Sequence, residues 1–398
     1  MSIQNLGGTV NTFVSAGSYG TDTGVLLSDG TILLTAHDTA TTMAVRYSTD
    51  EGATWTQCAT KITVPSGEWT SMLTADEFDY IYIHTEQTGN LADITACSFS
   101  GTDITILDNE GLGVAYPNKG SLVAIDNPTR TGDHTHVAFT GASGGSGIFI
   151  TVDFNRDTEL FDSGSQRTAS SPSISFNMGL VLLLSNTTED KRVAATPADP
   201  EAALIAYTGA TVISAWPVTW DSDNDYWTVG SVITETVSSA VFGGACYDPS
   251  LGRIFIIGGE SNTSAGVVTG DMPITTLTAR ADLSFVSGPE KATSLAPITN
   301  GNGDVRVVLM EDDAANVDLI ELVWSEGSTA FGSESTISAT QSLEHVASVG
   351  KCSLWSSGGR LLGYTWVIEG SAQPKIYTNW TEVVAASALL AGWGFIPI

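Results

Sequence analysis

Three aspartates at alternate positions form the first candidate site. Asp221, Asp223 and Asp225 have the carboxylate spacing of a calcium loop, in which alternate side chains turn their oxygens toward one hard cation. Tyr226 follows where such a loop has glycine, and no glutamate stands at the last ligand position. A solvated acidic turn is therefore the favoured interpretation, and calcium is the only cofactor that the sequence leaves open.

Three tryptophans surround this acidic segment. Exposed indole rings at Trp216, Trp220 and Trp227 would offer flat surfaces on which sugar rings or a protein partner can stack. In a chain with ten tryptophans the favoured interpretation is that these rings pack neighbouring strands together, but they are the best candidates for a recognition loop. We select the three tryptophans as the candidate ligand-binding residues.

Glycoside hydrolysis needs only two carboxyl groups at a fixed separation. Acidic residues stand near the ends of several predicted strands, and these are Asp38, Glu86, Glu260, Glu311 and Glu369. Their separations in space do not follow from the sequence, so no catalytic residue is assigned. The chain has no nucleophile elbow, phosphate loop or zinc-protease motif.

The elements that must position these residues are short strands. Runs rich in valine, isoleucine, threonine and aromatic residues alternate with clusters of glycine, asparagine, aspartate and proline. A turn followed by a strongly apolar strand occurs seven times, at residues 30–35, 79–84, 134–139, 179–184, 252–257, 304–309 and 359–364. Most copies have one apolar strand before them and another after them.

This repeat predicts an all-β fold, a single β-propeller. A period of roughly 40 to 50 residues with four short strands is the size of one propeller blade, and a closed ring leaves few free strand edges. We expect one domain over residues 1–398 with about seven four-stranded blades, six being the alternative. The approximate blade bounds are 22–57, 69–107, 120–161, 172–214, 240–285, 293–331 and 346–380.

One interval of the repeat is longer than the others. It separates the copies at 179–184 and 252–257, and it contains the three tryptophans. Either a loop has grown in this interval, or a poorly patterned pair of strands is present there.

Residues 48–55 read Ser-Thr-Asp-Glu-Gly-Ala-Thr-Trp. With Ser48, Asp50, Gly52, Thr54 and Trp55 at its five defining positions, this segment resembles the Asp-box, or BNR repeat, of sialidase-type β-propellers. The Asp50 carboxylate can accept backbone N–H bonds in the turn, Gly52 permits a positive φ, and Trp55 can pack the hairpin against its blade. The resemblance covers one blade well and the other blades only by their period.

The resemblance implies a structural turn between the third and fourth strands of a blade, on the face away from an active site. A sialidase would also need three arginines for the substrate carboxylate, a Tyr–Glu pair and an acid aspartate. Arginines are few in this chain, and no Arg-Ile-Pro-like segment stands near its N-terminus. Sialidase activity is therefore not expected, although scattered arginines could still converge in the folded chain.

The balance of charge limits the partners. Lysine and arginine number 15 against 44 aspartates and glutamates, which gives a net charge of −29. Such a surface repels nucleic-acid phosphates and anionic lipid headgroups. The first residues show no signal-peptide pattern, and no apolar run reaches the length of a membrane span. We therefore expect no nucleic-acid partner and no membrane insertion.

The composition, rich in threonine, serine, glycine and alanine, and the worn repeats resemble those of bacteriophage tail and fibre proteins. This resemblance implies a non-enzymatic propeller located in the virion, whose partner is a host-surface glycan or another virion protein. Homo-oligomerisation is left open. Two alternatives also stay open: a glycan-active enzyme, sialidase-like or another glycosidase, and a secreted, extracellular carbohydrate-binding lectin.

Overall fold

The structure is a computed structural model of the chain. It describes residues 3–5, 11–12, 24–39, 41–50, 54–64, 72–87, 91–115, 121–130, 132–143, 146–169, 180–184, 201–207, 211–238, 243–248, 251–261, 264–284, 295–299, 305–313, 316–325, 327–332, 335–342, 352–357, 360–366, 375–378 and 380–382. For parts of these strands only the backbone is described.

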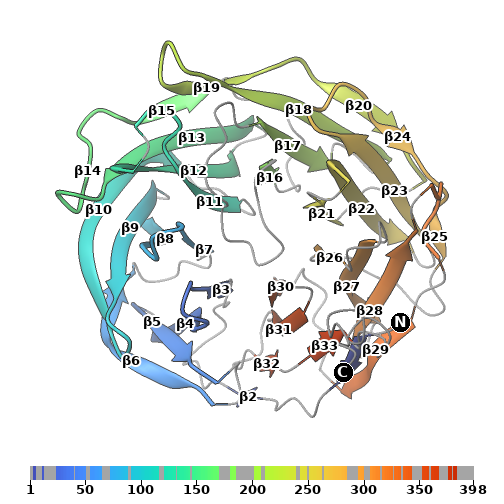
Figure 1. Cartoon of the computed structure of the whole chain (residues 1–398), viewed down its shortest axis with the longest axis horizontal. Coiled ribbons are helices and arrows are strands. Elements are labelled where there is room, and N and C mark those ends of the chain that lie inside the picture. The colour runs from blue at the N-terminus through green and yellow to red at the C-terminus, as the bar shows by residue number, and fades with distance from the viewer. Residues whose placement is uncertain are drawn as a thin grey trace, which may run out of the picture.

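The described residues form strands β1 to β33 and contain no helix. These strands make seven sheets of four or five strands and one sheet of two strands. Figure 1 shows the seven larger sheets arranged around a ring, with the first strand of each sheet nearest the centre and its last strands at the rim. All pairs between neighbouring strands are antiparallel.

The first four sheets follow one another along the chain. The first consists of β3 (Gly24–Leu26), β4 (Ile32–Thr39), β5 (Thr42–Ser48) and β6 (Thr56–Thr63). The second consists of β7 (Met72–Ala75), β8 (Ile81–Gln87), β9 (Leu91–Phe99) and β10 (Ile104–Ala115). The third consists of β11 (Ser121–Asp126), β12 (His134–Ser143), β13 (Ser146–Asn155), β14 (Leu160–Phe161) and β15 (Arg167–Ala169). The fourth consists of β16 (Leu180–Leu184), β17 (Glu201–Tyr207), β18 (Val212–Asp221), β19 (Tyr226–Val229) and β20 (Ile233–Thr236).

The last three sheets continue the ring. The fifth consists of β21 (Gly243–Asp248), β22 (Arg253–Ser261), β23 (Ser264–Asp271), β24 (Thr278–Ala279) and β25 (Leu283–Ser284). The sixth consists of β26 (Leu295–Thr299), β27 (Val305–Asp313), β28 (Asn316–Trp324) and β29 (Ser335–Ser342). The seventh consists of β30 (Cys352–Ser357), β31 (Arg360–Trp366), β32 (Lys375–Thr378) and the early strand β2 (Asn11–Thr12).

Contacts between first strands close the ring. The innermost strands of consecutive sheets contact one another in order from β3 to β30, and β30 in turn contacts β3. The outer edge of the seventh sheet is β2, which pairs with β32. β1 (Ile3–Asn5) pairs with β33 (Trp380–Glu382), and this pair contacts β29 and β31, so early and late segments of the sequence also meet beside the sixth and seventh sheets.

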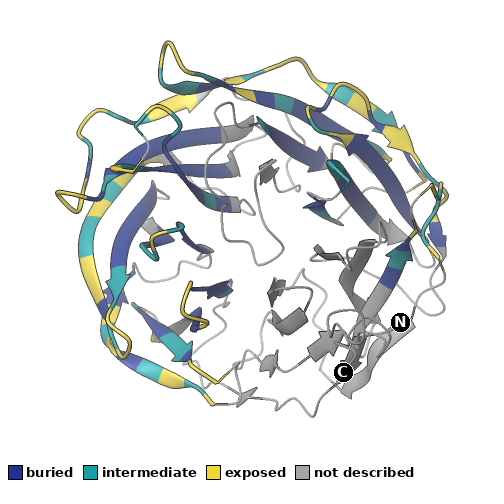
Figure 2. Cartoon of the chain, viewed as in Figure 1, coloured by how far each residue is buried: buried dark blue, intermediate teal, exposed yellow. Residues whose placement is uncertain are grey.

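The hydrophobic core is divided among the spaces between neighbouring sheets. In β22, Ile254 and Ile256 pack toward the fourth sheet, while Phe255 and Ile257 pack toward the sixth. Successive side chains of a strand point to opposite faces, and both faces are covered here, so all four residues are fully buried. This is why the sequence shows continuous apolar runs instead of alternation. Figure 2 shows burial concentrated in the inner strands and exposure at the rim.

The prediction of an all-β propeller agrees with this arrangement, but several predicted blade bounds differ from the sheets. Strands β15 of the third sheet, β29 of the sixth and β2 of the seventh lie outside the predicted bounds, and the largest difference is in the fourth. The fourth blade was expected to end at residue 214, whereas its sheet continues through β18, β19 and β20 to Thr236. The long interval of the repeat therefore contains a pair of strands. Pro217 lies within β18 and interrupts the β-pattern on which the boundary depended.

Candidate functional site

A cavity of about 490 Å³ lies between the third and fourth sheets. It is bordered by β13, β15 and β19, and β15 and β19 are outer strands of their sheets. Its lining residues are Phe149, Thr151, Arg167, Thr168, Asn224, Tyr226, Trp227, Thr228 and Val229. The volume is within the range of roughly 300 to 1,000 Å³ that small-molecule sites occupy.

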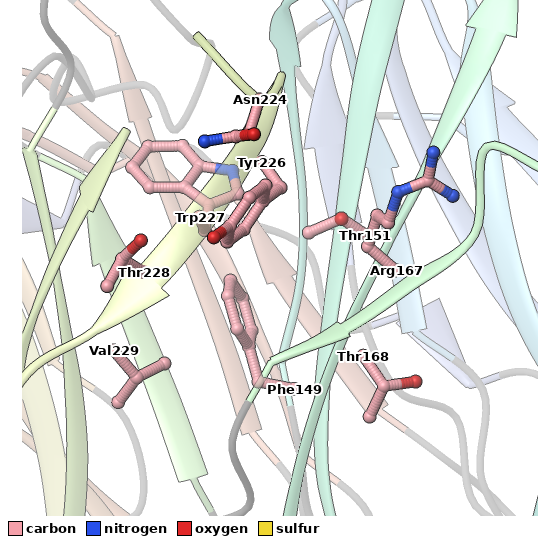
Figure 3. Close-up of a pocket in the computed structure, with 9 residues that line it drawn as sticks. All are labelled: Phe149, Thr151, Arg167, Thr168, Asn224, Tyr226, Trp227, Thr228 and Val229. Atoms are coloured by element: carbon pink, nitrogen blue, oxygen red, sulfur yellow. The ribbon is translucent and has the colours of Figure 1, made fainter. Parts of the chain in front are cut away.

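The floor and the rim of this cavity differ in exposure. The side chains of Phe149, Thr151 and Trp227 are buried, so packing holds them in place. Tyr226 is half-buried and Arg167 is exposed. Figure 3 shows Arg167 across the cavity from Tyr226 and Trp227, with Phe149 below Tyr226. A ligand would therefore meet a fixed aromatic floor and a polar, accessible rim.

The pairing of β13 with β15 builds one side of the cavity. Thr151 lies opposite Arg167 in this antiparallel ladder, and Phe149 lies opposite Ala169. Directly opposed residues present their side chains to the same face, as do residues two apart in one strand. Phe149, Thr151 and Arg167 are consequently brought to a single face of the third sheet.

A tight turn between β18 and β19 builds the other side. The Asp221 Oδ1 accepts hydrogen bonds from the backbone N–H groups of Asp223 (3.1 Å) and Asn224 (3.2 Å). Asp225 completes the turn with φ of 57°, a left-handed conformation that aspartate tolerates. β19 then begins at Tyr226, which lies opposite Asp221 in the ladder.

The guanidinium of Arg167 is oriented by the backbone of its own segment. Its Nη1 donates hydrogen bonds to the carbonyl oxygens of Gly164 (2.6 Å) and Gln166 (3.0 Å). These bonds use only one of the three guanidinium nitrogens. Its other donors remain available on the rim of the cavity.

A buried polar cluster lies beside the aromatic floor. The ring of His136 is 6.3 Å from that of Trp227, and its Nδ1 is 2.7 Å from the Asp153 Oδ1. The Asn127 Nδ2 donates to the same oxygen at 2.9 Å, and Arg130 pairs with the other oxygen of Asp153. Burial would raise the pKa of Asp153, but the hydrogen bond from His136 and the charges of His136 and Arg130 outweigh it and lower this pKa.

Arg130 also connects the third and fourth sheets. Besides Asp153, it contacts Asp162 (Nη1 to Oδ2, 2.7 Å) and Asp225 (Nη2 to Oδ2, 3.3 Å). Asp225 belongs to the turn that precedes β19. The ion pair therefore ties the wall formed by β19 to the polar cluster of the third sheet.

A second buried network joins the second and third sheets. The Asp76 carboxylate accepts hydrogen bonds from the hydroxyls of Tyr82 (3.0 Å) and Thr135. Arg156 donates to the Thr135 hydroxyl at 2.7 Å and pairs with Asp126 at 2.6 Å. Burial raises the pKa of Asp76 despite these bonds. These bonds join side chains of the second sheet to side chains of the third.

The expectation that three tryptophans form an exposed recognition loop is wrong. Trp216 and Trp220 lie on β18 and Trp227 lies on β19, and each is less than 9% exposed. Their rings belong to the hydrophobic cluster between the third and fourth sheets, and the rings of Trp220 and Trp227 pack edge to face at 5.3 Å. The favoured interpretation, that they pack strands together, is what the structure contains. Only Trp227 also lines the cavity.

The three aspartates with calcium-loop spacing do not converge within the described residues. Asp221 binds the backbone of its own turn, Asp225 faces Arg130, and Asp223 is exposed. No group of three or more metal-ligating side chains comes together anywhere in the described ranges. In the structure the carboxylates of Asp221 and Asp225 serve a turn and an ion pair.

The Asp-box-like segment lies between the third and fourth strands of the first sheet, β5 and β6. Asp50 accepts hydrogen bonds from the Ser48 hydroxyl (2.8 Å) and from Thr54. Trp55 packs against a cluster that contains Ile32. Gly52 lies outside the described residues.

The acidic residues predicted near strand ends have only partly described positions. Asp38, Glu86, Glu260 and Glu311 lie near the ends of β4, β8, β22 and β27, the second strands of their sheets. Their side chains, and all of Glu369, lie outside the described residues. They stay predictions.

Several cavity residues were not selected from the sequence, chiefly Phe149, Arg167, Asn224 and Tyr226. They come from two sheets and from segments far apart along the chain, and no local motif relates them. One signal was present in the sequence: arginines are scarce in so acidic a chain, and Arg167 follows a turn rich in glycine and serine.

The described residues contain no helix that could cross a membrane.

Comparison with known proteins identifies the fold. No protein-family model matches the chain, and no curated protein matches it. The periplasmic gluconolactonase of Pseudomonas aeruginosa is similar in structure at a TM-score of 0.56 and 10% identity, covering 93% of this chain and 92% of the other. A proposed 6-phosphogluconolactonase from Bacteroides uniformis gives 0.54 and 11% over the same shares.

A fungal lectin with a six-bladed β-propeller, from Aleuria aurantia, is more distant. Its TM-score is 0.42 at 12% identity, covering 84% of this chain and 98% of the lectin. At such identities the likeness to the two lactonase structures shows the fold alone. Together with the sheet topology, it shows that this chain is an all-β protein with a β-propeller fold.

Proposed function

We propose that this chain is a single seven-bladed propeller that binds glycans without hydrolysing them, and that the cavity between its third and fourth sheets is the binding site. The observation that carries the proposal is the composition of the lining: aromatic rings on a buried floor, surrounded by an arginine, an amide and hydroxyl groups. The seven sheets and the contact between β30 and β3 support the blade count.

The chemistry of a sugar fits such a lining. A sugar ring has an apolar C–H face that stacks on aromatic rings, which Tyr226 can supply from the rim. Its hydroxyl groups both donate and accept hydrogen bonds, and they would find the amide of Asn224 and the hydroxyl of Thr228. The cavity volume of about 490 Å³ suits one or two sugar units.

The same lining argues against hydrolysis at this cavity. A glycosidase uses two carboxyl groups on either side of the scissile bond, and none of the nine lining residues is an aspartate or glutamate. Glycan binding without turnover is therefore the expected activity. A place in the virion, with a host-surface glycan or another virion protein as partner, stays a prediction from the sequence.

A glycan array probed with the full chain, with a hydrolysis assay on the same sugars, tests this proposal. We expect binding without turnover, and we expect the variant Tyr226→Ala to lose it. Phe78→Ala is the matched control, because Phe78 is a 47% exposed aromatic residue outside the cavity. Binding that survives in Tyr226→Ala would overturn the site. Turnover of any glycoside, or no binding at all, would overturn the function.

A further inference from the structure

Arg167 differs from the arginines that the structure pairs with carboxylates. Arg130, Arg156 and Arg253 each form an ion pair with at least one aspartate, and Arg280 donates from Nε to the Thr269 hydroxyl and lies over the Trp324 ring. Arg167 bonds only to two backbone carbonyls, and within the described part of the chain no carboxylate pairs with it. In a chain with 44 acidic and 15 basic residues, Arg167 thus places at the cavity a guanidinium that no described carboxylate neutralises.

The bonds to the backbone also determine which part of the guanidinium is available. Because Nη1 is held by Gly164 and Gln166, the edge formed by Nε and Nη2 has two parallel donors without a partner. A guanidinium edge of this kind matches the two oxygens of a carboxylate or a sulfate in a bidentate hydrogen bond. The group is already oriented, so little side-chain entropy is lost when an anion binds.

The local charge of the cavity is opposite to that of the whole chain. The net charge of the chain is −29, yet the described lining residues include one arginine and no acidic residue. Asp225, which lies between two lining residues, is 3.3 Å from Arg130 and is compensated by it. The cavity is therefore a cationic site on an anionic protein.

We infer that the glycan bound in this cavity carries an acidic substituent, a carboxylate or a sulfate, and that the guanidinium of Arg167 binds it. This inference rests on the proposed function and identifies its ligand class. Aromatic contacts from Tyr226 would hold the sugar ring, and Arg167, on the opposite side of the cavity (Figure 3), would bind the anionic group. Specificity for acidic over neutral sugars would then depend on Arg167 alone among the lining residues.

The test uses arrayed oligouronates and sulfated oligosaccharides, each beside its methyl-esterified or desulfated counterpart. Measurements at about 0.15 M salt confine the repulsion by the chain's net charge to less than 10 Å or so. We expect the full chain to bind the acidic probes more tightly than their neutral counterparts. Arg167→Gln should weaken binding of the acidic probes roughly 10-fold to 100-fold and leave the neutral probes unchanged. Carboxylated and sulfated probes report separately which anion is preferred.

Two further variants separate the effect of net charge from the effect of the paired guanidinium donors of Arg167. Arg253→Gln changes the net charge by the same amount at an arginine that pairs with Asp271 outside the cavity, and it should retain the preference. Arg167→Lys keeps the charge but loses the paired donors, so it should restore only part of the binding. If Arg167→Gln keeps the preference for acidic probes, or if the full chain binds neutral counterparts equally well, the inference fails while the proposed function stands. If the full chain binds no probe of either kind, both fail.

Discussion

Thr54 donates two hydrogen bonds to the carboxylate of Asp50. The backbone N of Thr54 is 2.8 Å from Oδ1, and its hydroxyl Oγ1 is 2.7 Å from Oδ2. Burial raises the pKa of Asp50, but these bonds and the one from Ser48 outweigh it and lower this pKa below its ordinary value. The turn between β5 and β6 is thus stabilised by the ionised side chain.

We predict that Asp50→Ala lowers the free energy of unfolding by about 1 to 2 kcal/mol at pH 7, because several hydrogen bonds to a charged acceptor are lost. A carboxylate with a lowered pKa contributes stability above the ordinary Asp pKa of about 3.9, and this contribution disappears as the pH falls further. Urea denaturation at pH 7 and pH 3 measures the difference, which should shrink at pH 3. Asp223→Ala, at an exposed aspartate, should have little effect. Equal losses in both variants would contradict the prediction.

Asp93 makes the free energy of unfolding depend on pH in the opposite direction to Asp50. It lies on β9 with its side chain buried and its Oδ1 without a hydrogen-bond partner. Burial and the charge of Glu110 raise its pKa to about 6. The folded protein therefore favours the neutral acid, and stability is lost as the pH rises through 6 and the buried group ionises.

We predict that Asp93→Asn is more stable than the unaltered chain at pH 8 and that the difference disappears near pH 4. The amide has nearly the same shape and cannot ionise. Thermal denaturation between pH 4 and pH 8 measures the difference in stability between the variant and the unaltered chain. Asp157→Asn, at an exposed position, is the control. A stability difference that does not vary with pH would count against a raised pKa at Asp93.

Trp220 should be a stability residue and not a binding residue. It is 8% exposed, packs edge to face against His136 at 5.0 Å, and donates through Nε1 to Thr129 at 3.3 Å. Trp220→Ala is expected to cost about 3 to 5 kcal/mol of unfolding free energy, the usual cost of removing a large buried aromatic ring. Tyr226→Ala, at a half-buried position, should cost less. Urea denaturation compares the two, and an equal or smaller loss for Trp220→Ala would refute its place in the core.

Calcium should not stabilise the segment from Asp221 to Asp225. The carboxylate of Asp221 already caps its turn and that of Asp225 faces Arg130, so a cation would have to displace both interactions. We predict the same thermal midpoint in calcium and in a chelator. A calcium-dependent rise that Asp223→Asn abolishes would show instead that the aspartates converge when the ion binds.

The strands of this fold could be predicted well because their interiors are covered on both faces. The apolar run at residues 252–257 coincides with most of β22 and the run at 79–84 with the start of β8, since each side chain there packs against one neighbouring sheet or the other. The Asp-box-like turn was predictable for a different reason. Its hydrogen bonds join residues at most four apart, so one short segment contains every residue of the turn.

The candidate site could not be predicted in the same way. Arg167 and Tyr226 come to one cavity only because two separate sheets pack together, and this packing leaves no local spacing in the sequence. Trp216 and Trp220 were misleading because an indole is equally suited to a binding surface and to a core. The choice between these environments depends on the pairing of β18 with β17 and β19, which Pro217 obscured.

The use of β2 as the outer strand of the seventh sheet has a kinetic consequence. Asn11 and Thr12 pair with Ile376 and Lys375, so this ladder joins residues from nearly opposite parts of the chain, whereas the other six large sheets are each built from a continuous stretch. The entropy lost in closing a loop increases with its length, and contacts between distant residues slow folding. Those six sheets can therefore form early and independently, and the seventh is the step that must wait until the rest of the ring is in place.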